Sequence, residues 1–361
     1  MPSHLDDKPS TLPPSTAGAV GQTSPAPGAA AVPTVVLAPA LQANPLPASP
    51  IGQAALAAAK AFARQALSTA TLRAYQADWA HFAAWCGTAG WTPLPASPQA
   101  VAAYLASMAH THGRATIRRR LAAIGQMHRV HGHEWLPSHP AIRATLRGML
   151  RQHGAPSRRA AALTTAEIRR LVATCDSRRT GLRDRALLLL GYAAALRRAE
   201  LVAVLREHLV FTGDGALRLL IPRAKGDPEG EGAWIGVPRG ERKDTCPVRA
   251  LQAWLTAADC RYGPVFRKVD CWGRLETQAL HPDAVRQILG KRAAAAGLSV
   301  GAMERLSPHG LRAGFVTEAY TAGARDEQIM AHTRHRDLKT MRGYVRRAKL
   351  VAESPAKLLG L

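Results

Sequence analysis

The segment Ser307-Pro308-His309-Gly310-Leu311-Arg312 is the first of two polar clusters that decide the fold and chemistry of this chain. The second is His332-Thr333-Arg334-His335, which is followed by Asp337-Leu338-Lys339-Thr340-Met341-Arg342-Gly343-Tyr344. His309 and Arg312 are three residues apart, so their side chains share one face if the segment is helical. Further arginines, Arg346 and Arg347, follow Tyr344 closely. The stretch from Leu306 to Arg347 therefore gathers hydrogen-bond donors for a phosphate around a candidate nucleophile, Tyr344.

The charge of the chain indicates a polyanionic partner. Among 361 residues, lysine and arginine number 48 against 25 acidic residues, so the formal charge is 48 − 25 = +23. Each phosphate that a basic side chain neutralises releases condensed counterions, which favours nucleic acid as the partner. An anionic membrane surface fits less well, because the basic residues are spread through the sequence and do not line one amphipathic helix. The length predicts about two domains.

Neither targeting nor disulfide signals are evident in the sequence. The longest apolar run, from Ala186 to Leu196, is too short to span a bilayer, and the N-terminus has no basic segment followed by an apolar core. We therefore expect a cytoplasmic protein of a bacterium, a phage or a mobile element, with no membrane partner. The five cysteines form no Cys-x-x-Cys pair, so we expect reduced thiols; a zinc site that combines some of them with histidines is the alternative.

Composition divides the chain into five parts. Residues 1–55 are rich in proline and alanine and are expected to be a disordered tail. Residues 56–150 carry helical patterns, including an aromatic stripe of Tyr75, Trp79, Phe82 and Trp85, which we interpret as core and not as base-stacking groups. Residues 151–160 read as a basic linker, 161–349 as a second domain and 350–361 as a C-terminal segment.

Arginines in the first part of the chain are candidates for contact with DNA. A helix is expected to begin at Gly113-Arg114-Ala115-Thr116, and it would carry the run Arg118, Arg119 and Arg120. Such a run is a solvated face by default, but in so basic a chain we expect it to contact the DNA backbone. The same expectation applies to Arg158 and Arg159 of the linker.

The second domain is predicted to be helical with a small sheet. Thr164 and Glu167 form a helix-start signal, and a buried helix over 186–195 leads directly into Leu196-Arg197-Arg198-Ala199-Glu200-Leu201. Residues 216–221 and 233–237 read as two short strands, and the hairpin loop between them carries Lys225.

Six residues make the chain resemble a known protein family. They occur in the order and approximate spacing of the tyrosine recombinase (phage integrase) family, and they are Arg197, Lys225, His309, Arg312, His335 and Tyr344. The resemblance runs from about Leu67 to the C-terminus. It implies a mainly α fold, in which an N-terminal helical core-binding (SAM-like) domain and a mostly helical catalytic domain with a small β-hairpin sheet form a C-shaped clamp on double-stranded DNA. It also implies a homotetramer on two DNA sites, with residues 350–361 docking on a neighbouring protomer.

The resemblance implies a role for each of these residues. Tyr344 would attack a DNA phosphate to give a 3′-phosphotyrosyl enzyme, so that neither ATP nor a metal nor any other cofactor is required. Arg197 and Arg312 would clamp the phosphate, because guanidinium groups bind two oxygens at once. Lys225 would be the general acid, while His309 and His335 would hydrogen-bond the phosphate or accept the tyrosine proton.

Several residues compete for these roles. Arg198 could replace Arg197, Lys243 could replace Lys225, and His332 could replace His335. We expect Glu200 to be a structural partner and Tyr320 to belong to the core.

Three positions depart from the family pattern. Ala195 and Arg334 stand where glycine is usual, and Ala313 stands where histidine is frequent. None of these removes a catalytic group, although Arg334 changes the charge and the backbone freedom beside His335. The sequence therefore predicts a site-specific DNA recombinase. The alternatives are a non-catalytic DNA-binding protein of the same fold and a topoisomerase with the same chemistry.

Overall fold

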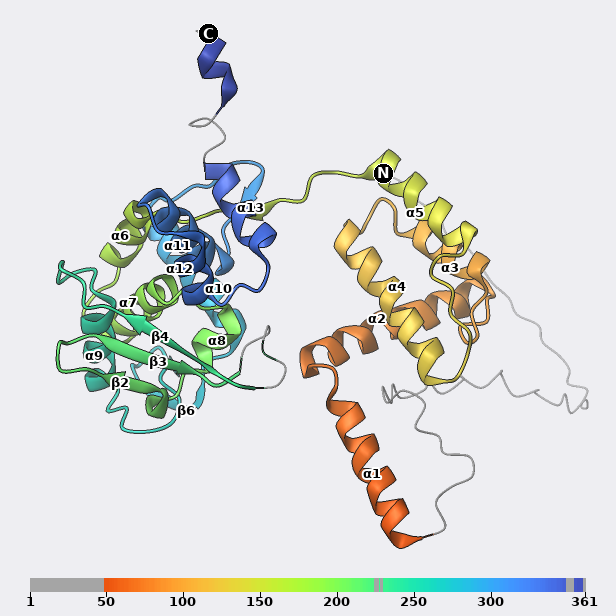
Figure 1. The fold of residues 1–361 in the computed structure, drawn as a ribbon, viewed down its shortest axis with the longest axis horizontal. Coiled ribbons are helices and arrows are strands. Elements are labelled where there is room, and N and C mark those ends of the chain that lie inside the picture. The colour runs from red at the N-terminus through yellow and green to blue at the C-terminus, as the bar shows by residue number, and fades with distance from the viewer. Residues whose placement is uncertain (1–48, 224–226, 228–229, 349–353, 360–361) are drawn as a thin grey trace, which may run out of the picture. The chain divides into compact units, whose positions relative to one another are not determined.

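The chain folds into two compact units that divide between Ala155 and Pro156 (Figure 1). The structure is a computed structural model, and it describes residues 49–223, 227, 230–348 and 354–359. Most of the predicted N-terminal tail lies outside the described residues, and so does Lys225. The predicted mainly helical fold with small sheets is confirmed. Within the described residues, no helix is long and apolar enough to cross a membrane.

The first unit consists of helices. They are α1 (Pro50–Gln65), α2 (Thr69–Ala89), α3 (Pro98–Ser107), α4 (Arg114–Val130) and α5 (Pro140–His153). Helix α1 starts inside the segment predicted as tail, because the Ser49 side chain accepts a hydrogen bond from the Gly52 amide and a proline occupies the first turn. An alanine-rich sequence then sustains the helix. Residues 50–55 are therefore helical, and α5 also extends three residues into the predicted linker.

Aromatic side chains fill the core of the first unit. Trp79, Phe82 and Tyr104 are fully buried, and Trp85 packs against them. The ring centroids of Phe82 and Tyr104 lie 4.9 Å apart in an edge-on arrangement, which aromatic quadrupoles favour. The prediction that this stripe is core is confirmed for Trp79, Phe82 and Trp85, whereas Tyr75 is only partly buried.

The second unit surrounds the buried helix α7 (Arg179–Ala193). Helices α9 (Pro247–Ala257), α6 (Thr165–Ala173) and α11 (His309–Thr321) pack against it. Strands β2 (Leu209–Phe211), β3 (Leu217–Ile221) and β4 (Ala233–Val237) form an antiparallel sheet, in which Leu219 pairs with Ile235. The two strands predicted here are confirmed to within one residue. The remaining elements are η1 (Arg206–His208), β5 (Arg267–Val269), β6 (Leu275–Ala279), α10 (Pro282–Ala295), η2 (Pro355–Leu359) and those introduced below.

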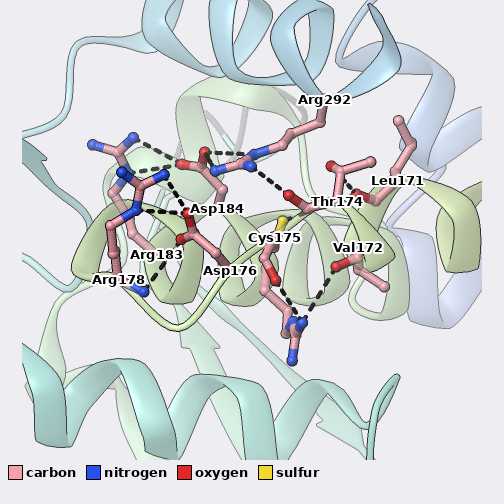
Figure 2. Close-up of polar contacts among 10 residues, drawn as sticks. Leu171, Val172, Thr174, Cys175, Asp176, Arg178, Arg183, Asp184 and Arg292 are labelled. Carbon is pink, nitrogen blue, oxygen red and sulfur yellow. Dashed lines mark hydrogen bonds and ion pairs between the residues drawn. The ribbon is translucent and has the colours of Figure 1, made fainter. Parts of the chain in front are cut away.

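A buried charge triad fastens α7 to α10 (Figure 2). The Asp184 carboxylate accepts hydrogen bonds from Arg183 at 3.0 and 2.7 Å and from Arg292 at 2.9 and 2.7 Å. All three side chains are less than a tenth exposed. Arg292 also donates to the Thr174 carbonyl, which ends α6. Helix α7 therefore begins before residue 186, the predicted start of the buried helix, and it can include Arg183 and Asp184 because these buried charges lie beside opposite charges.

A short pair of parallel strands connects the start of the second unit to the segment before α11. Strand β1 (Arg159–Ala160) pairs with β7 (Glu304–Arg305), and the Leu163 amide then donates to the Gly310 carbonyl at 3.1 Å. A Cβ atom at Gly310 would collide with the Ala161 carbonyl oxygen. Glycine is required there because α11 approaches the backbone of residues 161–163 directly. This contact fixes the start of α11, which carries His309 and Arg312.

Candidate active site

Arg312 is the buried centre of the site. Its side chain is 1% exposed, and Nη1 donates to the Ala195 carbonyl oxygen at 2.8 Å. The other terminal nitrogen, Nη2, is buried and has no hydrogen-bond partner among the described residues. Burial, aided by the nearby charges of Arg197 and Arg334, lowers the pKa of Arg312 to about 10. The guanidinium remains charged at neutral pH, and it has one donor available for an anion.

Two other arginines share one carboxylate beside it. Arg197, at the start of α8 (Arg198–Val202), donates to Glu200 through its backbone amide at 2.9 Å and through Nη1 at 2.7 Å. Arg334 donates to the same carboxylate at 2.8 Å. Burial alone would raise the pKa of Glu200, but the charges of Arg334 and Arg197 lower it below its usual value. Three guanidinium groups against one carboxylate leave a local charge of 3 − 1 = +2, which suits a phosphodiester.

The backbone explains two of the three departures from the family pattern. Ala195 has φ = 48° and Arg334 has φ = 58°, so both adopt the left-handed conformation that favours glycine. Ala195 presents its carbonyl to Arg312 in this conformation, and Arg334 ends helix α12 (Asp326–Thr333). The chain therefore keeps the backbone geometry that glycine would allow, while adding side chains there. The structure gives no reason for alanine at position 313.

His335 is close both to these arginines and to the candidate nucleophile. Its Nδ1 is 2.6 Å from the Thr333 hydroxyl, and its ring centroid is 6.1 Å from that of Tyr344. Burial, together with the charges of Arg312 and Arg197, lowers the pKa of His335 to about 4. His335 is therefore neutral at physiological pH in the absence of DNA.

Tyr344 is held at the site by a direct hydrogen bond. It lies on α13 (Leu338–Ala348), and its hydroxyl is 2.6 Å from Nε2 of His309 on α11. The two ring centroids are 5.8 Å apart. The structure thus brings Arg197, His309, Arg312, His335 and Tyr344 together.

The contacts of each side chain distinguish the competing residues that the sequence left open. Arg198 points to Asp283 on α10, at 2.6 Å, and so does not replace Arg197. His332 is 2.8 Å from the Ala193 carbonyl and stacks on Phe315, which removes it from the site. Tyr320 packs against the small core of α11, α12 and α13. Lys243 is exposed, and Lys225 lies outside the described residues.

A cavity of about 210 Å³ adjoins His335. Its wall combines the ends of β3 and β4 with the loop after α12, and the lining residues are Ile221, Asp227, Glu231, Gly232, Ala233, Arg334, His335 and Arg336. The Asp227 carboxylate accepts three hydrogen bonds from the amides of Gly230, Glu231 and Gly232. These hydrogen bonds hold Asp227 against residues 230–232, beside His335 in the wall of the cavity.

The arginines predicted to contact DNA differ in exposure. Arg118 is exposed, whereas Arg119 forms a two-bond ion pair with Asp78 at 2.6 and 2.9 Å. Arg120 is 8% exposed and points to Asp78 and Met108, so it is a core residue of the first unit in this conformation. Arg158 donates to the Glu304 carbonyl, and Arg159 is exposed. No metal cluster of three or more histidine, cysteine or acidic side chains occurs within the described residues.

Two residues of the candidate site, Thr333 and Arg334, were not predicted from the sequence. Thr333 had no assigned role, although a threonine two residues before a candidate histidine is a local signal for a hydrogen bond between them. Arg334 was recognised only as a departure, because its partner Glu200 is 134 residues earlier in the chain.

Comparisons with known proteins agree with this geometry. The profile of the Phage integrase family matches residues 161–350. The chain is 33% identical over 290 residues to the integrase/recombinase xerD homolog of Selenomonas ruminantium, covering 79% of this chain and 83% of that protein. It is 27% identical over 279 residues to the tyrosine recombinase XerD of Lacticaseibacillus casei, covering 77% and 88% of the two chains.

Solved structures share the fold. The XerH site-specific recombinase, bound to a palindromic difH substrate in a post-cleavage complex, matches with a TM-score of 0.59 and 14% identity, over 87% of this chain and 86% of that chain. A lambda integrase dimer bound to a COC′ core site matches with a TM-score of 0.54 and 16% identity, over 79% and 74%. At these identities the structures support the architecture alone.

Proposed function

This chain belongs to the phage integrase family of tyrosine recombinases, and from that premise we propose that it cuts and rejoins DNA through Tyr344 at specific sites. One observation carries the assignment to these residues. The hydroxyl of Tyr344 is bound to His309, which is three residues from the buried Arg312 and its available Nη2 donor. A nucleophile and an anion-binding group are thus held by adjacent helices.

The proposed reaction exchanges one phosphodiester for another. The Tyr344 oxygen forms a bond to phosphorus while the bond from phosphorus to the 5′ oxygen breaks, which leaves a 3′-phosphotyrosyl enzyme and a 5′ hydroxyl. Arg312 and Arg197 stabilise the charge on the non-bridging oxygens, where a single lost donor costs about 10²–10³ in rate. Lys225 would protonate the leaving oxygen, and His309 would orient Tyr344 and accept its phenolic proton. Attack by another strand's 5′ hydroxyl reverses the step, so no nucleotide cofactor enters it.

In this proposal the two units have different functions. Residues 56–150 would bind DNA, with the exposed Arg118 as a phosphate contact, and residues 161–349 would carry out catalysis, with Arg159 at their boundary contacting the DNA backbone. Four protomers would assemble on two DNA sites, each with its 350–361 segment docked on a neighbour. Support for DNA binding comes from the proteins of similar fold, since the two solved structures above are complexes with DNA.

Covalent capture on DNA tests the proposal. A nicked suicide substrate loses a short fragment after cleavage, so the protein-DNA adduct accumulates and is seen as a shifted band on a denaturing gel. We expect the adduct with the wild-type protein and none with Tyr344→Phe. Tyr320→Phe is the matched control, since Tyr320 lies in the adjacent core and should leave adduct formation unchanged. An adduct that persists in Tyr344→Phe would refute the assignment of the nucleophile. Relaxation of supercoiled plasmid lacking any specific site would instead favour a topoisomerase.

A further inference from the structure

Thr333 is a buried residue with two short contacts. It is the last residue of α12 and is 0% exposed. Its Oγ1 lies 2.6 Å from the Ile329 carbonyl oxygen and also 2.6 Å from Nδ1 of His335. Both distances are those of good hydrogen bonds.

Counting protons fixes the direction of both bonds. A threonine hydroxyl has one proton, and a carbonyl oxygen has none to give. The hydroxyl proton therefore lies toward Ile329, since two oxygens 2.6 Å apart with no proton between them would repel each other. Oγ1 is then an acceptor for His335, which requires a proton on Nδ1.

We propose that Thr333 is a positioning residue that holds His335 as its Nδ1-protonated tautomer, so that Nε2 enters the site as a hydrogen-bond acceptor. This inference about roles rests on the proposed function, whereas the tautomer itself does not. A neutral His335 in this form cannot donate to a phosphate oxygen through Nε2. It could do so only after gaining a second proton, because Thr333 disfavours the opposite neutral tautomer.

The surroundings of His335 disfavour that second proton. Arg197, Arg312, Arg334 and His309 all act to lower its pKa, in addition to burial. Across the adjoining cavity, the ionisable groups that line the wall with His335 are Asp227, Glu231, Arg334 and Arg336. The Tyr344 ring faces it from α13. Both carboxylates of the cavity come from the hairpin loop, while Arg334 and Arg336 come from the end of α12 and the loop after it. This arrangement supports Nε2 of His335 as the acceptor of a hydrogen bond, and it disfavours both uptake of the Tyr344 proton by His335 and donation from Nε2 to a phosphate.

Nitrogen NMR tests the tautomer directly. In full-length protein with 15N-labelled histidine, long-range 1H–15N correlations distinguish protonated from unprotonated ring nitrogens, and His335→Gln identifies the signals of His335. We expect a protonated Nδ1 and an unprotonated Nε2 at neutral pH. A wild-type spectrum with the proton on Nε2 overturns the proposal, and this measurement needs neither DNA nor a Thr333 variant.

Two substitutions at Thr333 link the tautomer to catalysis. Thr333→Val keeps the shape but removes the hydroxyl, while Thr333→Ser keeps the hydroxyl. We expect Thr333→Val to give a mixture of tautomers and to cleave the suicide substrate about 3- to 10-fold more slowly, which corresponds to one net hydrogen bond. Thr333→Ser should keep the wild-type tautomer and recover most of the rate. If Thr333→Val keeps the wild-type tautomer and rate, Thr333 does not position His335. If no variant forms an adduct, the proposed function fails, but the NMR result still decides the tautomer.

Discussion

Arg312→Lys is the substitution for which the structure predicts the most specific result. Arg312 uses Nη1 to bind the Ala195 carbonyl and keeps Nη2 for an anion. Lysine has a single nitrogen, which cannot occupy both positions. Loss of one preorganised donor to the transition state costs about 10²–10³ in cleavage rate.

The same substitution should make cleavage sensitive to pH. Burial, aided by the charges of Arg197 and Arg334, lowers the pKa of Arg312 to about 10. The same burial and charges would lower the pKa of a lysine at this position below its usual value. Such a lysine would lose its charge as the pH rises through the alkaline range, and the cleavage rate should fall with it, whereas the wild-type guanidinium stays charged to a higher pH.

The assay is single-turnover formation of the covalent adduct on the suicide substrate across this pH range. DNA affinity, measured separately, should change little, because most phosphate contacts lie elsewhere. Cleavage within about threefold of wild type, with a parallel pH profile, would refute the claim that Arg312 contributes a charged donor to the reaction.

Three further predictions concern stability, charge and DNA binding. Asp184→Asn should lower the free energy of unfolding by about 3–5 kcal/mol and Tm by about 6–20 °C, since it leaves buried guanidinium groups unpaired. In the same thermal scan, Asp244→Asn should leave Tm nearly unchanged, because Asp244 belongs to an exposed ion pair. Arg334→Gly should raise the pKa of His335 in an NMR titration, because it removes a positive charge that opposes protonation. Glycine also accepts the left-handed backbone conformation at this position. An unchanged titration would contradict the claim that the Arg334 charge lowers the pKa of His335. Arg118→Ala should reduce the slope of log DNA affinity against log salt concentration by about 1, and the loss of affinity should be similar for specific and random DNA. An unchanged slope would exclude a phosphate contact at Arg118.

The sequence was sufficient for those parts of the fold that depend on local patterns. The strands around the hairpin and the choice of Arg197 over Arg198 agree with the structure, because alternation and helix phase are local properties. Helix α1 was missed because proline and alanine dominate both the preceding tail and the helix. In that composition only the serine cap signals the start of a helix.

The electrostatic design of the site could not be predicted in the same way. The sequence identified Glu200 as structural, but not that it pairs with Arg334 across the fold. That contact depends on a left-handed residue at the end of α12, which redirects the chain in a way that no periodicity encodes. The role of the Ala195 carbonyl was likewise invisible, since a backbone acceptor has no residue type to recognise.

The pairing of β1 with β7 has a mechanical consequence. Arg159 and Ala160 pair with Glu304 and Arg305, and the Leu163 amide is bonded to the Gly310 carbonyl at the start of α11. A pull on β1 would therefore be transmitted through backbone hydrogen bonds to the helix that carries His309 and Arg312.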